Sequence, residues 1–154
     1  EALADKVVDV GEYLSSLGGP WQRATEATRI ALHVPCTLQH GQRINGVVER
    51  LLEQAGYTLQ PVADSHLCCG SARTYNLMQP EISKELKARK VKTLEERNPD
   101  LIAAGNIGCM MQIGSGTEVP IVHTVELLDW ATGGPKPPSL EKGSNAPGDV
   151  PVLR

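Results

Sequence analysis

The sequence contains no phenylalanine, and aromatic residues make up only 3% of its 154 residues. A buried core must therefore rest on leucine, isoleucine, valine and alanine. The chain also lacks an excess of positive charge, because its formal net charge is -3 at pH 7. Domains that bind nucleic acid usually carry a basic patch, so we expect no nucleic-acid partner.

Long hydrophobic segments are missing as well. No apolar run approaches the roughly 20 residues that cross a bilayer. The opening segment EALADKVVDV also lacks the charge and apolar pattern of a secretion signal. We therefore expect a cytoplasmic protein, with a peripheral position at the cytoplasmic face of the membrane as a second option.

The four cysteines lack the paired C-x-x-C spacing of many metal sites. They stand at Cys36, Cys68, Cys69 and Cys109. Adjacent cysteines cannot bridge to each other without strain, and nothing in the sequence indicates an oxidising compartment. We therefore expect free, catalytic or metal-bound thiols in place of disulfides.

Strand and helix patterns alternate along the chain. Strands are predicted at 29–34, 57–62, 101–104 and 119–122, and helices at 42–55, 80–97 and 124–131. The helix at 80–97 is expected to bury Ile82, Leu86 and Leu94 and to turn its lysines toward solvent. This alternation predicts an α/β fold, a Rossmann-like three-layer unit with a parallel sheet of about four strands.

The chain divides into three parts. Residues 1–19 predict a helix, and residues 8–14 are weakly similar to residues 122–128, so this helix is interpreted as the end of a preceding copy of the same unit. Residues 20–132 form the main domain. Residues 133–154 are rich in proline and glycine and predict a disordered tail.

Each predicted strand but the last is followed by cysteine. Cys36 follows the first strand, Cys68 and Cys69 follow the second, and Cys109 follows the third. The carboxyl ends of parallel strands meet at one edge of the sheet, which is where open α/β sheets place their ligands. Four thiolates at one site repel each other unless a cation lies between them. The topology therefore predicts a metal centre at this edge.

The kind of metal is less determined. Soft thiolate ligands select zinc, copper(I) or iron–sulfur clusters. A structural zinc site usually has two tight cysteine pairs, whereas adjacent cysteines suit a cluster whose irons take neighbouring sulfurs. Gly70 lets the backbone approach such a cluster closely. The spacing thus favours an iron–sulfur cluster and leaves zinc and plain thiol chemistry open.

Four histidines lie near the cysteines in sequence or at the same predicted edge. His66 precedes the adjacent pair, and His33 and His40 flank Cys36. Each can donate a hydrogen bond to a sulfur or replace a ligand, but an ordinary structural role is the simpler expectation, especially for His33. His123 opens the last helix and faces the same rim, with the same two options.

Three segments around the cysteines resemble a known family. Residues 33–40 (HVPCTLQH), 64–72 (DSHLCCGSA) and 106–109 (NIGC) are similar to the second CCG cysteine-rich unit of glycolate oxidase iron–sulfur subunits. The family is related to the CCG-containing subunit of heterodisulfide reductase. The resemblance covers about residues 29–130, so the main domain is identified as a CCG cysteine-rich domain.

The resemblance implies a function for the cysteines. It implies an iron–sulfur cluster of the [4Fe–4S] type, cubane or non-cubane, with zinc as the alternative; an isolated domain can also be empty. The implied ligands are Cys36, Cys68, Cys69 and Cys109. The fullest family pattern ends in C-x-x-C, and Gln112 stands in place of the last cysteine, which argues against a fifth thiolate. Between Cys109 and Gln112, Met110 and Met111 are expected to fill the core.

The implied partners are the flavin-bearing subunits of a glycolate oxidase complex and an N-terminal ferredoxin-like part of the same subunit. Electrons would pass through this domain to an acceptor such as quinone, and glycolate itself would be oxidised elsewhere. Two rival functions remain open: a structural zinc module that docks subunits, and thiol–disulfide chemistry.

Overall fold

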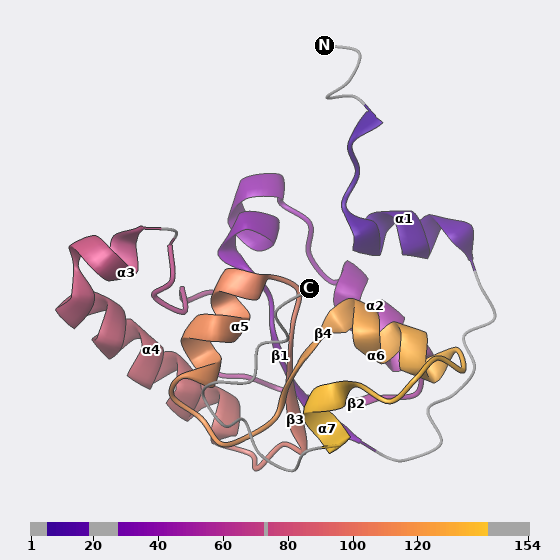
Figure 1. Ribbon diagram of the computed structural model, residues 1–154. Helices are drawn as coiled ribbons and strands as arrows, with labels where there is room; N and C mark the ends of the chain where they lie inside the picture. Colours follow the sequence, from indigo (N-terminus) through magenta and orange to yellow (C-terminus); the bar gives the residue numbers. More distant parts are fainter. Residues whose placement is uncertain (1–5, 19–27, 73, 142–154) are drawn as a thin grey trace, which may run out of the picture.

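The computed structural model describes residues 6–18, 28–72 and 74–141, which form an α/β unit around one parallel sheet (Figure 1). Its strands are β1 (Arg29–His33), β2 (Thr58–Gln60), β3 (Leu101–Ala104) and β4 (Ile121–His123). They run in the order β2-β1-β3-β4, and every neighbouring pair is parallel. The predicted fold class is therefore confirmed.

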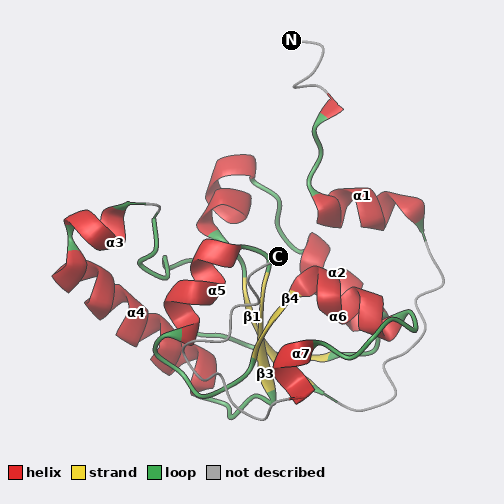
Figure 2. Cartoon of the chain, viewed as in Figure 1, coloured by secondary structure: helices red, strands yellow, loops and turns green. Residues whose placement is uncertain are grey.

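Helices cover both faces of the sheet, which gives three layers (Figure 2). One face packs against α2 (Val47–Gln54) and α6 (Thr124–Ala131), and the other packs against α4 (Pro80–Glu95) and α5 (Ile107–Gly114). Successive residues of a strand point to opposite faces. In β1, Ile30 and Leu32 therefore enter the core on the α2/α6 side, whereas Ala31 enters the core on the α4/α5 side.

Local signals fix the helix starts next to the sheet edge. The Asn106 side chain accepts a hydrogen bond from the Cys109 amide at 3.1 Å and caps α5. His123 caps α6, because its Nδ1 accepts from the Val125 amide at 3.2 Å, while Glu126 accepts from the His123 amide at 3.0 Å. Both helices consequently begin directly beyond the strands that precede them.

Two helix predictions differ from the structure. The helix predicted at 42–55 begins later, because α2 starts at Val47, and a π-helix, η2 (Thr37–Gln42), precedes it. Arg43 and Gly46 adopt positive φ angles of 60° and 74°, which interrupts the helix.

The prediction of which α4 residues are buried was also partly wrong. Its buried residues are Ser83, Lys90, Val91 and Leu94, whereas Ile82 is 47% exposed. The buried face of α4 is shifted by about one residue from the predicted apolar stripe. The reason is that Ser83 and Lys90 have polar partners inside the domain, which are described below.

The two ends of the chain carry short helices. Helix α1 (Val10–Leu17) begins later than expected, is capped by Asp9 and packs on the core through Leu14. Helix α7 (Pro138–Glu141) lies in the segment predicted as a disordered tail, and its Leu140 packs on the core, so the expectation fails for these residues. Residues 1–5 and 142–154 lie outside the described residues. The proposed domain boundaries stay predictions.

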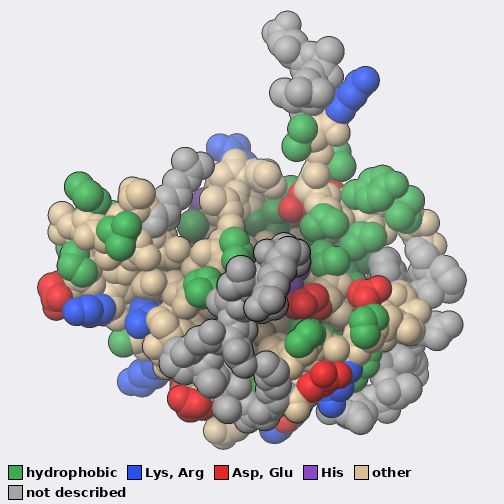
Figure 3. Space-filling model, in the orientation of Figure 1, with side chains coloured by type: hydrophobic (Ala, Val, Ile, Leu, Met, Phe, Trp, Pro, Cys, Tyr) green, Lys and Arg blue, Asp and Glu red, His purple; other side chains and the backbone are tan. Residues whose placement is uncertain are grey.

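Apolar side chains also reach the surface. Over α1 they are Val7, Val8, Val10, Tyr13 and Leu17, and over α3 (Tyr75–Met78) they are Leu77 and Met78 (Figure 3). Within residues 6–18, 28–72 and 74–141, none of the helices has the length and apolarity that crossing a membrane requires.

Candidate metal centre

The structure gathers the four cysteines at the carboxyl edge of the sheet, as predicted. Cys36 lies just beyond β1 at the start of η2, Cys68 and Cys69 lie in the loop after β2, and Cys109 lies in the first turn of α5, beyond β3. Cys69 and Cys109 are buried, and Cys36 and Cys68 are half-buried. All four are free thiols.

The sulfurs form two interacting pairs. Cys36 makes a side-chain hydrogen bond with Cys68, and burial raises the pKa of Cys68. A hydrogen bond from the Cys109 thiol lowers the pKa of Cys69, and the same bond raises the pKa of Cys109. The charges of Cys36 and Cys68 also raise the pKa of Cys109. A second thiolate is therefore disfavoured until a cation joins the group.

Gly70 holds the adjacent pair in place. Its amide donates to the Cys68 Sγ at 3.3 Å, and its φ is +88°. A Cβ added at this position would lie 2.6 Å from the Ser83 carbonyl oxygen, and the Ser83 hydroxyl donates to the Gly70 carbonyl at 2.9 Å. Only glycine satisfies both the backbone angle and the close contact with α4.

Gln112 supports this loop from α5. Its Nε2 donates to the Ser83 Oγ at 2.8 Å. Gln112, which stands where the family pattern has its last cysteine, thus contacts Ser83, and Ser83 in turn donates to the Gly70 carbonyl.

Lys90 was missed by the sequence analysis, which placed the lysines of this helix in solvent. It is only 2% exposed, and its Nζ donates to the carbonyl oxygens of Asp64 at 2.9 Å and Ser65 at 3.4 Å. Burial lowers the pKa of Lys90, while the negative charge of nearby Cys69 opposes that shift. A cation therefore lies beneath the loop that carries the cysteine pair.

His33, for which the sequence favoured an ordinary structural role over a contact with a sulfur, lies at the site. It is 2% exposed, and neither ring nitrogen has a hydrogen-bond partner of normal geometry among the described residues. One ring nitrogen and the sulfurs of Cys69 and Cys109 all lie within 4.8 Å of one another. The available signal was the alternation in β1, which pairs the face of His33 with that of Ala31, but the sequence does not show which face holds the sulfurs.

The other histidines have structural contacts. His40 Nε2 hydrogen-bonds the His66 carbonyl oxygen at 3.1 Å, which ties η2 to the cysteine loop. The His66 side chain is exposed, and His123 caps α6. Met110 packs on the core as expected, whereas Met111 is 56% exposed, so its expected role in the core was wrong.

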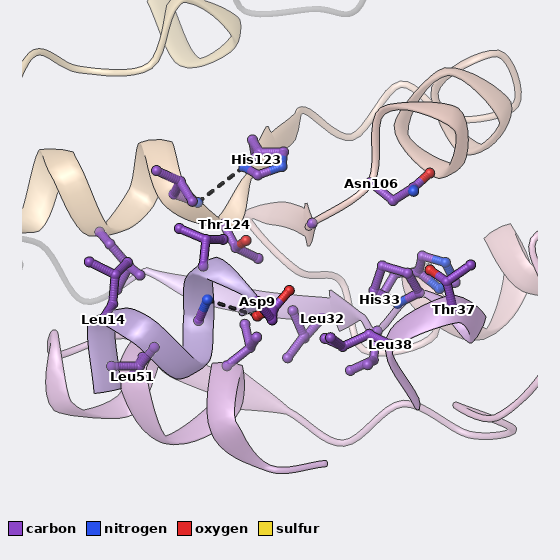
Figure 4. Close-up of a pocket in the computed structure, with 18 of the residues that line it drawn as sticks. Asp9, Leu14, Leu32, His33, Thr37, Leu38, Leu51, Asn106, His123 and Thr124 are labelled. Atoms are coloured by element: carbon purple, nitrogen blue, oxygen red, sulfur yellow. Dashed lines mark hydrogen bonds between the residues drawn. The ribbon is translucent and has the colours of Figure 1, made fainter. Parts of the chain in front are cut away.

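A cavity of about 220 Å³ lies at the same sheet edge on the α2/α6 side (Figure 4). His33, Thr37 and Asn106 stand at one end of it, and Leu14 and Leu51 stand toward the other. No cysteine lines it. The thiols therefore lie on the α4/α5 side of the sheet. His33 lies between the cavity and the thiols, because it lines the cavity and is also close to Cys69 and Cys109.

The donor set fits a soft metal. Thiolates and imidazole are ligands that iron–sulfur clusters and zinc accept. The thiols repel one another when ionised, and the buried imidazole of His33 faces the Cys69 sulfur without a hydrogen bond of normal geometry. A metal centre between these groups would neutralise the thiolates and bind the ring nitrogen.

Comparison with known proteins agrees with this geometry. Residues 30–114 match the family model described as the CCG cysteine-rich domain. The chain is 44% identical to the glycolate oxidase iron–sulfur subunit of Escherichia coli (strain K12) over 103 residues, which cover 67% of this chain and 25% of that protein.

More distant relatives have a different name. Lactate utilization protein A of Oceanobacillus iheyensis is 27% identical over 136 residues, 82% of this chain and 55% of that protein. The homologue from Geobacillus kaustophilus is 31% identical over 133 residues, 80% of this chain and 49% of that protein. The chain thus spans between a quarter and about half of the length of these relatives. Since the family model covers more than half of the chain and its cysteines converge at one sheet edge, this chain belongs to the CCG cysteine-rich domain family.

Proposed function

We propose that this chain is an electron-transfer domain that holds an iron–sulfur cluster. The observation that carries the proposal is the meeting of four free thiols from three separate loops at one sheet edge. The proposed ligands are Cys36, Cys68, Cys69 and Cys109. A bound iron–sulfur cluster supplies reversible one-electron exchange.

The chain's own groups determine how such a centre is held. Thiolate ligands bring negative charge, which the buried Lys90 ammonium offsets from below the cysteine loop. The Gly70 amide donates to Cys68, and such N–H groups stabilise charge on sulfur. Burial of Cys69 and Cys109 excludes water from that end of the site. Together these features favour electron exchange over chemistry on a bound substrate.

The finer proposal follows the relatives' names. The chain is a part of a subunit of a glycolate-oxidising complex, in which flavin-bearing subunits supply electrons and a quinone or another acceptor takes them. An N-terminal ferredoxin-like part of the same polypeptide would relay electrons to this domain. The cluster would be of the [4Fe–4S] type, in a cytoplasmic protein that can dock at the membrane face. Glycolate oxidation itself would occur on the partner subunits.

A structural zinc module is the second candidate. Its supporting observation is the compact group of His33, Cys69 and Cys109, whose ligand atoms lie within 4.8 Å of one another, because a tetrahedral zinc site needs only four ligands. Such a module would dock subunits without exchanging electrons.

Anaerobic purification of the polypeptide that carries this chain separates the two candidates. Metal analysis and visible absorption should find iron, sulfide and a brown colour, and the colour should bleach on reduction. Cys36→Ser and Cys69→Ser should each lose the iron of this site, and reduced acceptor should no longer form. Met111→Ala, an exposed change on the same helix as Cys109, is the matched control and should keep both. Colourless protein with one zinc per chain would refute the electron-transfer proposal.

A further inference from the structure

The backbone of β1 turns His33 toward the sulfurs. Ile30 and Leu32 pack on the α2/α6 side, and Ala31 packs with Cys69 on the α4/α5 side. Because side chains alternate along a strand, His33 lies on the same face as Ala31. Ala31 is small, which leaves space beside it for the imidazole and the cysteine loop.

The burial of His33 is costly unless another group binds its ring. Both ring nitrogens are enclosed, and neither has a hydrogen-bond partner of normal geometry among the described residues. A buried polar atom without a partner costs about 1–3 kcal/mol, and native proteins nearly always provide a partner. A hydrogen bond with His33 is one of the interactions that lower the pKa of Cys69, so the ring already faces a sulfur of the site. A metal held between the ring and that sulfur would bind the ring nitrogen directly.

The position of the ring indicates a metal. Zinc binds sulfur at about 2.3 Å and imidazole nitrogen at about 2.0–2.1 Å. In a tetrahedral site two such ligand atoms lie roughly 3.5–3.8 Å apart. The ring nitrogen and the sulfurs of Cys69 and Cys109 lie within 4.8 Å of one another, so side-chain movements of about 1 Å suffice to close the set.

Among the described residues, the other nitrogen-bearing side chains of this region have partners elsewhere. Gln112 donates to Ser83 and His40 contacts the His66 carbonyl. His123 accepts from an α6 amide, and Lys90 donates to the carbonyls of Asp64 and Ser65. The four cysteines supply sulfur only. A nitrogen ligand at this centre can therefore come from one residue of the described chain near the sulfurs.

We propose that His33 is a direct nitrogen ligand of the metal centre, bound together with Cys69 and Cys109. This inference rests on the proposed function for the cluster, but it makes a separate claim about the composition of the ligand set. A mixed sulfur and nitrogen set gives the centre one fewer negative charge than a set of thiolates alone. Imidazole ligation raises the reduction potential of an iron–sulfur centre for this reason.

The test uses the complete polypeptide that carries this chain, purified anaerobically with its metal. Pulsed electron paramagnetic resonance on the paramagnetic state should detect a strongly coupled nitrogen. The coupling should change to the pattern of ¹⁵N when the protein is grown with ¹⁵N-histidine. His33→Cys should keep the metal, lose the nitrogen coupling and shift the reduction potential to a more negative value.

Two further variants control for folding and for the other histidines. His33→Leu removes the ligand and should weaken metal binding by at least about tenfold, with circular dichroism reporting whether the domain still folds. His40→Gln should leave the nitrogen coupling and the potential unchanged, because His40 contacts a carbonyl oxygen and no sulfur.

The outcomes separate this inference from the proposed function. Iron without a strong nitrogen coupling, or with a coupling that survives in His33→Cys, overturns His33 ligation and leaves the cluster proposal standing. A weak coupling of the size expected for a hydrogen bond to a sulfur also overturns it. Failure of the wild-type protein to bind iron overturns the proposed function first.

Discussion

The two faces of the sheet differ in what they bury. On the α2/α6 side the core consists of aliphatic side chains and Tyr57, from Ile30 in β1 to Ala131 in α6. On the α4/α5 side the core includes Cys69 and Cys109, and the polar residues His33, Ser83 and Lys90 are buried there as well. Both faces belong to the same four strands. The difference therefore comes from the side chains that the helices and loops on each side contribute.

This difference separates stability from function. A closely packed aliphatic core is sufficient to hold a sheet and two helices together. Buried thiols, a lysine and a histidine add no comparable stabilisation, because polar groups lose hydration when they are buried. Their presence on one side is consistent with a ligand site there, whereas the aliphatic core of the other side mainly stabilises the fold.

Leu52→Ala tests the stabilising side and has the largest expected effect. Leu52 is fully buried in the α2/α6 core, and such a truncation costs about 2–5 kcal/mol because it leaves a cavity. Urea unfolding should show this loss, while the iron content of the folded protein stays the same. Leu77→Ala, which is 78% exposed, should cost less than about 0.5 kcal/mol. Loss of iron from folded Leu52→Ala protein would contradict the division between the two sides.

Lys90→Met tests the α4/α5 side, which holds the candidate metal centre. The change removes a buried cation that donates to the carbonyl oxygens of Asp64 and Ser65, although the Leu67 amide still donates to the Asp64 carbonyl. Metal affinity should fall by about 10- to 100-fold, and the reduction potential should become more negative, because the extra electron loses a nearby positive charge. Metal titration and potentiometry measure the two effects. The exposed Lys84→Met on the same helix serves as the control, and equal behaviour of the two variants would exclude a role for the buried charge.

A substitution at Tyr57, which lies on the α2/α6 side, has the smallest expected effect on stability. Its hydroxyl donates to the Leu127 carbonyl at 2.7 Å, and burial raises the pKa of Tyr57 to about 12. In the unfolded chain the pKa is about 10. The raised pKa therefore contributes its full stability below about pH 10, and this contribution is lost as the pH rises toward 12.

Tyr57→Phe isolates that contribution. At neutral pH the variant should lose about 0.5–1.5 kcal/mol for the hydrogen bond. Denaturant midpoints of the two proteins should converge between pH 10 and 12, because only the wild-type protein loses the contribution of this tyrosine. Tyr13→Phe, at an exposed position, should follow the wild-type curve. Parallel curves for Tyr57→Phe and wild type across this range would contradict the raised pKa.

The elements with strong local signals were predicted well. The strand Leu101–Ala104 and the helix Thr124–Ala131 have the predicted bounds, because a short buried apolar run and a capped amphipathic segment are encoded within a few residues. The helix predicted at 42–55 is present as Val47–Gln54, but its start was misplaced because Arg43 and Gly46 take positive φ angles. A non-glycine residue gives little warning of such an angle.

The candidate site was predicted only as far as the cysteines. Their positions after successive strands, together with parallel topology, placed them at one edge. The error concerns Lys90, which is buried because the loop at Asp64 and Ser65 offers it two carbonyl oxygens. For His33 the sequence left a structural role and a contact with a sulfur open, and the structure places its ring near Cys69 and Cys109. Both environments depend on residues from distant segments.

The sequence by itself determined the α/β class, the succession of strands and helices along the chain, and the sulfur ligands proposed for a metal centre. These features follow from periodicity, from capping residues and from the rule that parallel strands end together, all of which act over short stretches of chain. Only the tertiary structure decided which face of β1 meets the sulfurs, that Lys90 lies beneath them, and that Gln112 supports Gly70 through Ser83. Those facts depend on how helices rotate when they pack, and the free energy that sets this rotation comes from contacts between residues far apart in the sequence.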